Sequence, residues 1–273
     1  MDTFWKLILR QAQDDGKNFL PWRMILTIAR EALMRQVRFD HLYFMCQEIP
    51  AAPPYEVAPK RPFAWITWTL VGSTVAIFLL QLLSLHVYGV DVVGDTLAFS
   101  SQAWADHRYW TLLTYAWAHA VVLFGDPGLF WLHIVSNMLP LIFLGPPMEE
   151  LLGKWRFLGL YLGGAISSAL VWFLFNPGVD EPIIGASGAI FALIAAAGTA
   201  APHTRVVVYF FFVLPIPMSL QVLAIAACGI ELIQIIFNWM PEVAHSAHLG
   251  GAAFGFLYIM GVRLVSRQRT SFH

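Results

Sequence analysis

Long apolar stretches, separated by short polar segments, most constrain how this chain can fold. A helix needs roughly 20 mainly apolar residues to cross a lipid bilayer, and several stretches approach that length. The composition points the same way, because 58% of the 273 residues are hydrophobic and only 12% are charged. Soluble domains carry about 25% charged residues. We therefore predict an all-α membrane protein.

Six membrane-spanning helices are predicted from the distribution of apolar residues, at 63–85, 129–144, 155–175, 184–201, 218–237 and 244–262. The second, fourth and sixth contain polar residues or many small ones, which is typical of helices that other helices shield from lipid. The apolar run 206–214 is too short to span, and Pro215 and Pro217 separate it from the next helix. We expect it to form a short connector that dips into the membrane.

The placement of Lys and Arg predicts the orientation, because cytoplasmic segments of membrane proteins are enriched in both. Basic residues gather in the first 62 residues, between the second and third predicted spans, at Arg205 and in the C-terminal tail. Arg108 lies on the opposite side. Both termini are thus expected in the cytoplasm, which requires an even number of spans. A multi-pass protein of the bacterial inner (plasma) membrane fits this pattern.

Three regions are expected along the chain. Residues 1–62 form an N-terminal cytoplasmic or amphipathic extension and linker, whose helices either lie on the membrane surface or make a small solvated unit. Residues 63–263 form a six-helix domain, and 264–273 a cytoplasmic tail. The aromatic-rich external segment 87–128 is expected to sink partly into the membrane interface. The net charge of -1 suggests no nucleic-acid partner.

Ser187 lies in Gly185-Ala186-Ser187-Gly188, near the start of the fourth predicted span. A hydrogen-bonding side chain inside the membrane is costly and suggests a function. The small neighbours allow another helix to approach and leave the hydroxyl uncovered. Two interpretations are open: a nucleophile, or a serine bonded to its own backbone within a small-residue packing face.

His248 lies in the sixth predicted span, three residues before Gly251 and on nearly the same helix face. Gly251 and Gly255 form a pattern of small residues that draws a neighbouring helix close, and that helix would meet the imidazole. The alternatives are a structural histidine bonded across helices and a metal ligand paired with His245. Because the surrounding ligand spacing is poor, we expect no metal site.

His133 and Asn137 are four residues apart and so share one face of the second predicted span. Each can donate a hydrogen bond to the negative charge that develops on a carbonyl oxygen during acyl transfer, and one such donor is worth about 3 kcal/mol of barrier. Bonding between helices is the alternative. Glu149, at the cytoplasmic end of this span, is expected to cap or pin a loop, and Arg108 to anchor a loop at the interface.

Taken together, these side chains supply a hydroxyl, an imidazole and two further donors from three separate spans, which is the equipment for acyl transfer. His248 would accept the Ser187 proton and return it to the leaving amine. No acidic residue lies near His248 in the sequence. We therefore expect a Ser-His dyad without the third member of a triad.

The motif around Ser187, with His248 in Ala247-His248-Leu249-Gly250-Gly251, resembles the rhomboid family of intramembrane serine proteases. Further motifs follow in the family's order over about residues 63 to 263. They are Arg108-Tyr109-Trp110 and His119 of the first external loop, the oxyanion-binding His133 and Asn137, and Glu149 to Gly153 after the second span.

The resemblance implies a six-transmembrane-helix rhomboid-like bundle with a membrane-associated first external loop and no required cofactor. It assigns the base to His248 rather than His245, because the family's histidine directly precedes Leu-Gly-Gly. Phe191 stands where relatives stack an aromatic ring on this imidazole. Substrates would be single-pass transmembrane proteins, cleaved within the lipid bilayer. The alternatives are an inactive rhomboid-like protein that binds membrane clients, and a small transporter with His133 and His248 in a proton path.

Overall fold

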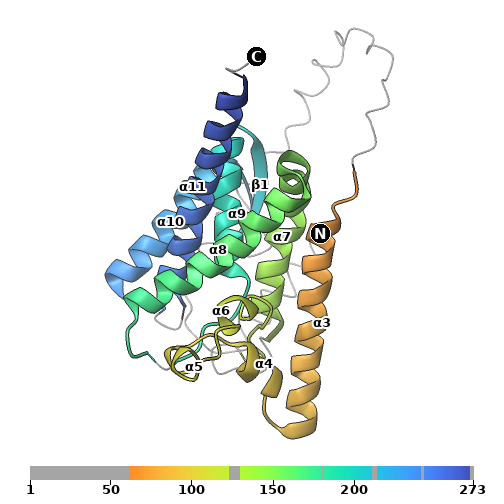
Figure 1. The fold of residues 1–273 in the computed structure, drawn as a ribbon, viewed down its shortest axis with the longest axis vertical. Coiled ribbons are helices and arrows are strands. Elements are labelled where there is room, and N and C mark those ends of the chain that lie inside the picture. Colours follow the sequence, from red (N-terminus) through yellow and green to blue (C-terminus); the bar gives the residue numbers. More distant parts are fainter. Residues whose placement is uncertain (1–61, 123–129, 180, 211–213, 241–242, 271–273) are drawn as a thin grey trace, which may run out of the picture. The chain divides into compact units, whose positions relative to one another are not determined.

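The computed structural model describes residues 62–122, 130–179, 181–210, 214–240 and 243–270. Six long helices dominate it (Figure 1): α3 (Trp65–Tyr88), α7 (Phe130–Leu152), α8 (Lys154–Phe175), α9 (Ser187–Ala200), α10 (Leu220–Phe237) and α11 (His245–Thr270). Three short helices follow α3, namely α4 (Val92–Leu97), α5 (Ser101–Ala105) and α6 (Thr111–Thr114). The predicted N-terminal extension and the end of the predicted tail lie outside the described residues.

Each of the six predicted segments contains a helix, and the chain is an integral multi-pass membrane protein. Within the described residues, α3, α8, α10 and the first 20 residues of α11 are long and apolar enough to cross a membrane. Helix α9 has only 14 residues, and α7 carries three prolines. A total of six crossings remains a prediction. Helix α7 runs past the predicted end at 144, because neighbouring helices let prolines persist in membrane helices.

The connector predicted at 206–214 overlaps a two-stranded sheet of β1 (Arg205–Phe210) and β2 (Leu214–Ser219). Strand β2 contains Pro215 and Pro217, and proline cannot donate to a ladder. In a sheet of two strands, however, each strand has one unpaired edge, where the missing N–H groups do no harm.

Helix α9 lies at the centre of the packing, in contact with α7, α8, α10 and α11. Half of its 14 residues are buried alanines and glycines. Gly251 and Gly255 of α11 face its backbone, so that a Cβ at either position would collide with the carbonyl oxygen of Gly188 or Ala192. This absence of side chains brings α9 and α11 close together.

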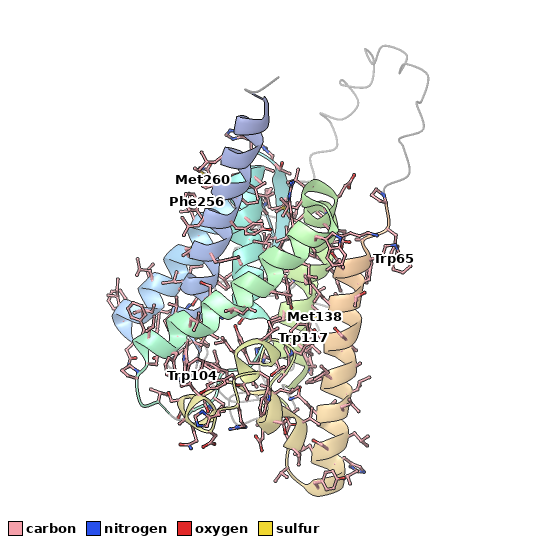
Figure 2. The ribbon with its side chains drawn as sticks, viewed as in Figure 1. Trp65, Trp104, Trp117, Met138, Phe256 and Met260 are labelled. Carbon is pink, nitrogen blue, oxygen red and sulfur yellow. The ribbon has the colours of Figure 1, made fainter. Side chains whose placement is uncertain are left out.

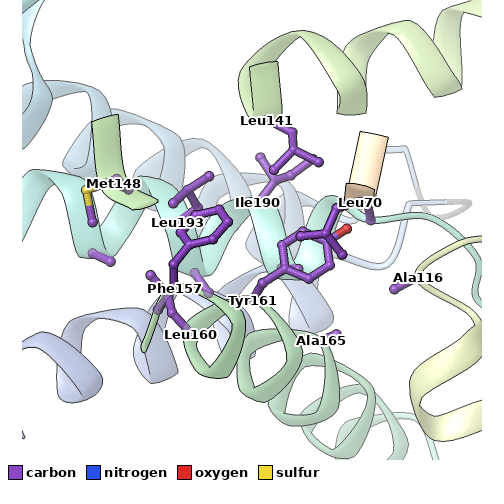
Figure 3. Packing of buried hydrophobic residues seen from close by; sticks show 14 of the residues in the cluster. Leu70, Ala116, Leu141, Met148, Phe157, Leu160, Tyr161, Ala165, Ile190 and Leu193 are labelled. Atoms are coloured by element: carbon purple, nitrogen blue, oxygen red, sulfur yellow. The ribbon is translucent and has the colours of Figure 1, made fainter. Parts of the chain in front are cut away.

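Larger side chains fill the space on the other side of α9. Figure 3 shows Tyr161 and Leu160 of α8 near Ile190 and Leu193 of α9, within one buried cluster that also includes Leu141 of α7. The outer faces of α3 and α11 carry exposed apolar side chains instead, such as Trp65, Phe256 and Met260 (Figure 2). Contiguous exposed apolar surface of this kind indicates contact with lipid.

The segment from α4 to α6 is tied to the bundle by specific hydrogen bonds. The Tyr115 hydroxyl donates to the carbonyl oxygen of Ala165 at 2.8 Å, and Trp117 Nε1 donates to Ser73 Oγ at 2.9 Å. Phe99 and Ile183 form an antiparallel bridge between this segment and the chain entering α9. The loop therefore helps to position the start of α9.

Gly251→Ala places a methyl group against the Gly188 carbonyl oxygen. Overpacking of this kind costs about 1–3 kcal/mol, so we expect the free energy of unfolding to fall by about that amount. The thermal unfolding midpoint in detergent measures it. Gly261→Ala is the matched control on the same helix, since a Cβ there meets nothing within 4 Å. Equal midpoints for the two variants would contradict the close-contact interpretation.

Candidate active site

Ser187 is the first residue of α9 and is held by the loop before it. Gly185 adopts φ 110°, which side chains rarely tolerate, and its N–H donates to the Tyr115 carbonyl oxygen at 3.0 Å. The first N–H groups of a helix lack acceptors within the helix. The Ser187 hydroxyl therefore lies beside an uncommitted backbone N–H at the positive end of the helix dipole.

His248 of α11 faces this hydroxyl, with Nε2 2.8 Å from Ser187 Oγ. Phe191, one turn further along α9, stacks on the imidazole with 4.5 Å between ring centroids and an interplanar angle of 4°. The stacked ring limits rotation of His248. The geometry thus unites Ser187, His248 and Phe191, which the sequence motifs had singled out together.

Glu231 of α10 was missed by the sequence analysis, and the expectation of no carboxylate beside His248 is wrong. Its Oε1 lies 3.0 Å from His248 Nδ1, a distance typical of an ion pair, although the alignment is not that of a hydrogen bond. Glu231 is buried. The available signal was Glu231 itself, the single charged residue in the apolar run of α10.

His245 contacts the other oxygen of the same carboxylate, with Nδ1 2.6 Å from Glu231 Oε2. Its Nε2 lies 3.0 and 3.1 Å from the carbonyl oxygens of Trp239 and Met240. Glu231, His245 and His248 have potential metal-ligand atoms within 4.8 Å of one another. They are the group of described residues that comes closest to a metal site. Glu242, a carboxylate three residues before His245 in the sequence, lies outside the described residues.

His133 of α7 is fixed in one tautomer by the backbone. The Ala120 N–H donates to His133 Nδ1 at 3.0 Å, so that Nδ1 is unprotonated and Nε2 carries the hydrogen. A Cβ on Gly185 would lie 2.7 Å from this Nε2. The glycine therefore leaves room beside Ser187 for a group that could accept the His133 N–H.

Asn137 lies one turn further along α7 and points toward the same space. Its Nδ2 donates to the His133 carbonyl oxygen at 2.7 Å, which uses one of its two hydrogens. A Cβ on Gly185 would lie 3.9 Å from this Nδ2. The second amide hydrogen remains available, and the buried Oδ1 has no partner among the described residues. The structure thus brings His133 and Asn137 beside Gly185, two residues before Ser187.

His119, in the loop before α7, packs against His133 with 5.1 Å between ring centroids. It is fully buried, and its backbone N–H donates to Gln81 Oε1. Burial lowers the pKa of His119 to about 3, and the neighbouring His133 acts in the same direction. His119 is therefore neutral at physiological pH and adds no charge beside His133.

Comparison with protein families matches residues 106–264, more than half of the chain, to the Rhomboid domain. The chain belongs to the rhomboid family. The matched rhomboid region includes Ser187, His248, Glu231, His245, His133, Asn137 and His119.

Individual relatives carry rhomboid names. Presenilin-associated rhomboid-like protein A, mitochondrial, from Danio rerio is 33% identical over 141 residues, covering 50% of this chain and 36% of that protein. Rhomboid protein 1, mitochondrial, from Saccharomyces cerevisiae is 26% identical over 260 residues, covering 91% of this chain and 65% of that protein. The chain thus spans from about a third to two thirds of these relatives. Both names specify mitochondria, so they give no support to a bacterial inner membrane.

Glu149 and Arg108 lie away from Ser187 in this rhomboid structure. The buried carboxylate of Glu149 accepts hydrogen bonds from the N–H groups of Ile66 and Thr67 at 3.0 and 2.8 Å, and from Thr67 Oγ1 at 2.8 Å. It therefore satisfies the first turn of α3, which precedes the matched rhomboid region. Arg108 donates to the Asp95 carbonyl oxygen at 3.1 Å, within the segment from α4 to α6.

Glu149→Ala should lower the free energy of unfolding by about 2–4 kcal/mol, because three hydrogen bonds to a charged acceptor are lost at a helix start. Thermal unfolding in detergent measures this loss. Glu150→Ala is the control, since Glu150 is the adjacent, exposed carboxylate on the same helix. A Glu149→Ala protein as stable as Glu150→Ala would contradict the capping role.

Proposed function

We propose that this rhomboid protein is an intramembrane serine endopeptidase that cleaves transmembrane segments through Ser187 and His248. The single observation that carries the proposal is the 2.8 Å contact between Ser187 Oγ and His248 Nε2. This distance lies within the range required for proton transfer between a nucleophile and its base. Family membership supports the same reaction class.

In the first step, His248 Nε2 takes the hydroxyl proton as Ser187 Oγ attacks the carbonyl carbon of the scissile peptide bond. His248 then returns this proton to the leaving amine, which yields an acyl-enzyme. Water hydrolyses the ester by the same proton transfers, with His248 again acting as base and then as acid. The reaction needs no cofactor.

The oxyanion formed in each step would be stabilised by three donors. They are the Ser187 backbone N–H at the start of α9, the His133 Nε2–H and the free hydrogen of Asn137 Nδ2. His133 is suited to this role because its Nδ1 already accepts the Ala120 N–H. Its other nitrogen can therefore only donate.

Substrates in this proposal are single-pass transmembrane proteins that reach the site from the lipid bilayer. The apolar exposed surfaces of the long helices support membrane burial of the site. We also propose that both termini lie on the cytoplasmic side, as the basic residues suggest. The alternative, an inactive protein that binds membrane clients, is disfavoured by the hydrogen-bonded Ser187–His248 pair.

The wild-type protein in detergent should react with a fluorophosphonate probe and cleave a model transmembrane substrate. Ser187→Ala should do neither, because the probe forms its bond with the activated hydroxyl. Ser136→Ala, which removes an exposed hydroxyl on α7, serves as the control and should behave like the wild type. An unlabelled wild type that cleaves no substrate would refute the protease and favour the client-binding alternative.

His248→Ala should also abolish cleavage, whereas His245→Ala should lower kcat and leave measurable activity. The reason is that His248, and not His245, contacts Ser187. Initial rates on the same substrate separate the two variants. Full loss in His245→Ala with residual activity in His248→Ala would reverse the assignment of the base.

His133→Ala and Asn137→Ala should each lower kcat by about 10²–10³-fold with little change in KM, because each removes a donor that acts mainly on the oxyanion. Steady-state kinetics with a transmembrane substrate provide the measurement. His86→Ala, at the exposed end of α3, is the histidine control. Unchanged kcat in both site variants would remove these residues from the oxyanion site.

A further inference from the structure

The group formed by Glu231, His245 and His248 is not explained by a Ser-His dyad. Both oxygens of the Glu231 carboxylate face imidazole nitrogens, at 2.6 Å for His245 and 3.0 Å for His248. All three side chains are buried or nearly so. A buried carboxylate is stable only where it is paired, so its partners define what it does.

His245 shares one proton with Glu231. Its Nε2 faces the carbonyl oxygens of Trp239 and Met240, which only accept, so that Nε2 must carry hydrogen. A second proton lies between Nδ1 and Glu231 Oε2, whichever atom holds it, because two acceptors would repel at 2.6 Å. The His245–Glu231 pair therefore has no net charge, and the short distance is typical of a charge-assisted hydrogen bond.

The shared proton lies between His245 Nδ1 and Glu231 Oε2. The other oxygen, Glu231 Oε1, therefore accepts a hydrogen bond whichever atom holds that proton. The nearest ionisable group to Oε1 is His248 Nδ1, which has no other hydrogen-bond partner among the described residues. An acceptor there favours hydrogen on Nδ1 and leaves the Nε2 lone pair for the Ser187 proton. The contact is not aligned as a hydrogen bond, as is common for catalytic pairs without substrate.

From this geometry we propose that Glu231, neutralised by His245, is a positioning residue that holds His248 in the tautomer able to accept the Ser187 proton. The proposal rests on the proposed function. In place of the expected dyad, the proposal links four side chains: Ser187, His248, Glu231 and His245. They are carried by three helices, α9, α10 and α11. Glu231 also faces the positive charge that His248 gains during each proton transfer, and so stabilises the imidazolium.

A metal ion held by the same three residues is the competing explanation, and the distances disfavour it. Ligand atoms on a tetrahedral Zn²⁺, about 2.0–2.1 Å from the ion, lie about 3.3 Å apart. The observed separations of 2.6 and 3.0 Å are both shorter, and the 2.6 Å separation matches a shared proton instead.

The test uses Glu231→Gln in the 273-residue chain in detergent. Glutamine is neutral and cannot share a proton with His245, so it offers His248 Nδ1 no charged acceptor. Hydrogen on Nδ1 is then no longer favoured, and a ring with hydrogen on Nε2 cannot take the Ser187 proton. We expect kcat to fall by about 10³–10⁴-fold while KM changes by less than about twofold. Glu150→Gln, the same change at an exposed position, is the control and should match the wild type.

The imidazole tautomer is the measurement that a purely structural role would not move. ¹⁵N NMR of labelled wild-type protein should show hydrogen on His248 Nδ1, and Glu231→Gln should shift it to Nε2. Hydrogen on Nε2 in the wild type would overturn the proposal, even if the variant fails to fold. So would unchanged kcat in a folded Glu231→Gln protein. One equivalent of tightly bound zinc, found by metal analysis and lost in Glu231→Gln, would overturn it in favour of the metal site.

The proposed function can be refuted independently of the role of Glu231. If the wild-type protein neither reacts with the fluorophosphonate probe nor cleaves a substrate, the protease assignment falls. The wild-type NMR spectrum still decides which nitrogen of His248 carries hydrogen, and therefore whether Glu231 positions it.

Discussion

The close contact between α9 and α11 supports everything else in the site. Gly251 and Gly255 of α11 lie against the backbone of Gly188 and Ala192 in α9, so close that a Cβ on either glycine of α11 would collide. Helices in lipid gain little from burying apolar surface against one another, so packing of small residues has to hold them together. Because Ser187 and His248 each lie one to three residues from these glycines, the same contact sets the distance between hydroxyl and imidazole.

The buried polar groups of the site together carry little net charge. His119 is kept neutral, His133 is fixed as a neutral donor, and Glu231 is matched by His245. Isolated charges would be costly at such depth. A site of this kind can hold several ionisable groups among apolar helices, because each one shares a proton or a hydrogen bond with a neighbour.

Much of this architecture could be predicted from the sequence, because apolar length and small-residue spacing are local signals. The six long helices followed from apolar length, and Ser187, His248, His133 and Asn137 from polar residues inside those helices. The contact between Glu231 and His245 could not be predicted. The two residues lie 14 positions apart on two helices, and residue spacing does not show how the connection between those helices orients them. The β1–β2 pairing was not predicted, because the apolar run 206–214 was interpreted only by its length, and Pro215 and Pro217 only as a break before the next helix. The tautomer of His133 depends on one loop N–H, which no side-chain pattern reveals.

That loop N–H has a consequence for control of the reaction. As long as Ala120 donates to His133 Nδ1, the ring presents a hydrogen to the space beside Gly185. If the backbone at Ala120 turned away, Nδ1 could take the hydrogen, and Nε2 would then present a lone pair that repels an oxyanion. The backbone position of Ala120 and the readiness of the oxyanion site are therefore linked. A peptide bond that enters while Ala120 keeps this position meets a ring that can only donate, which suits the charge that its cleavage creates.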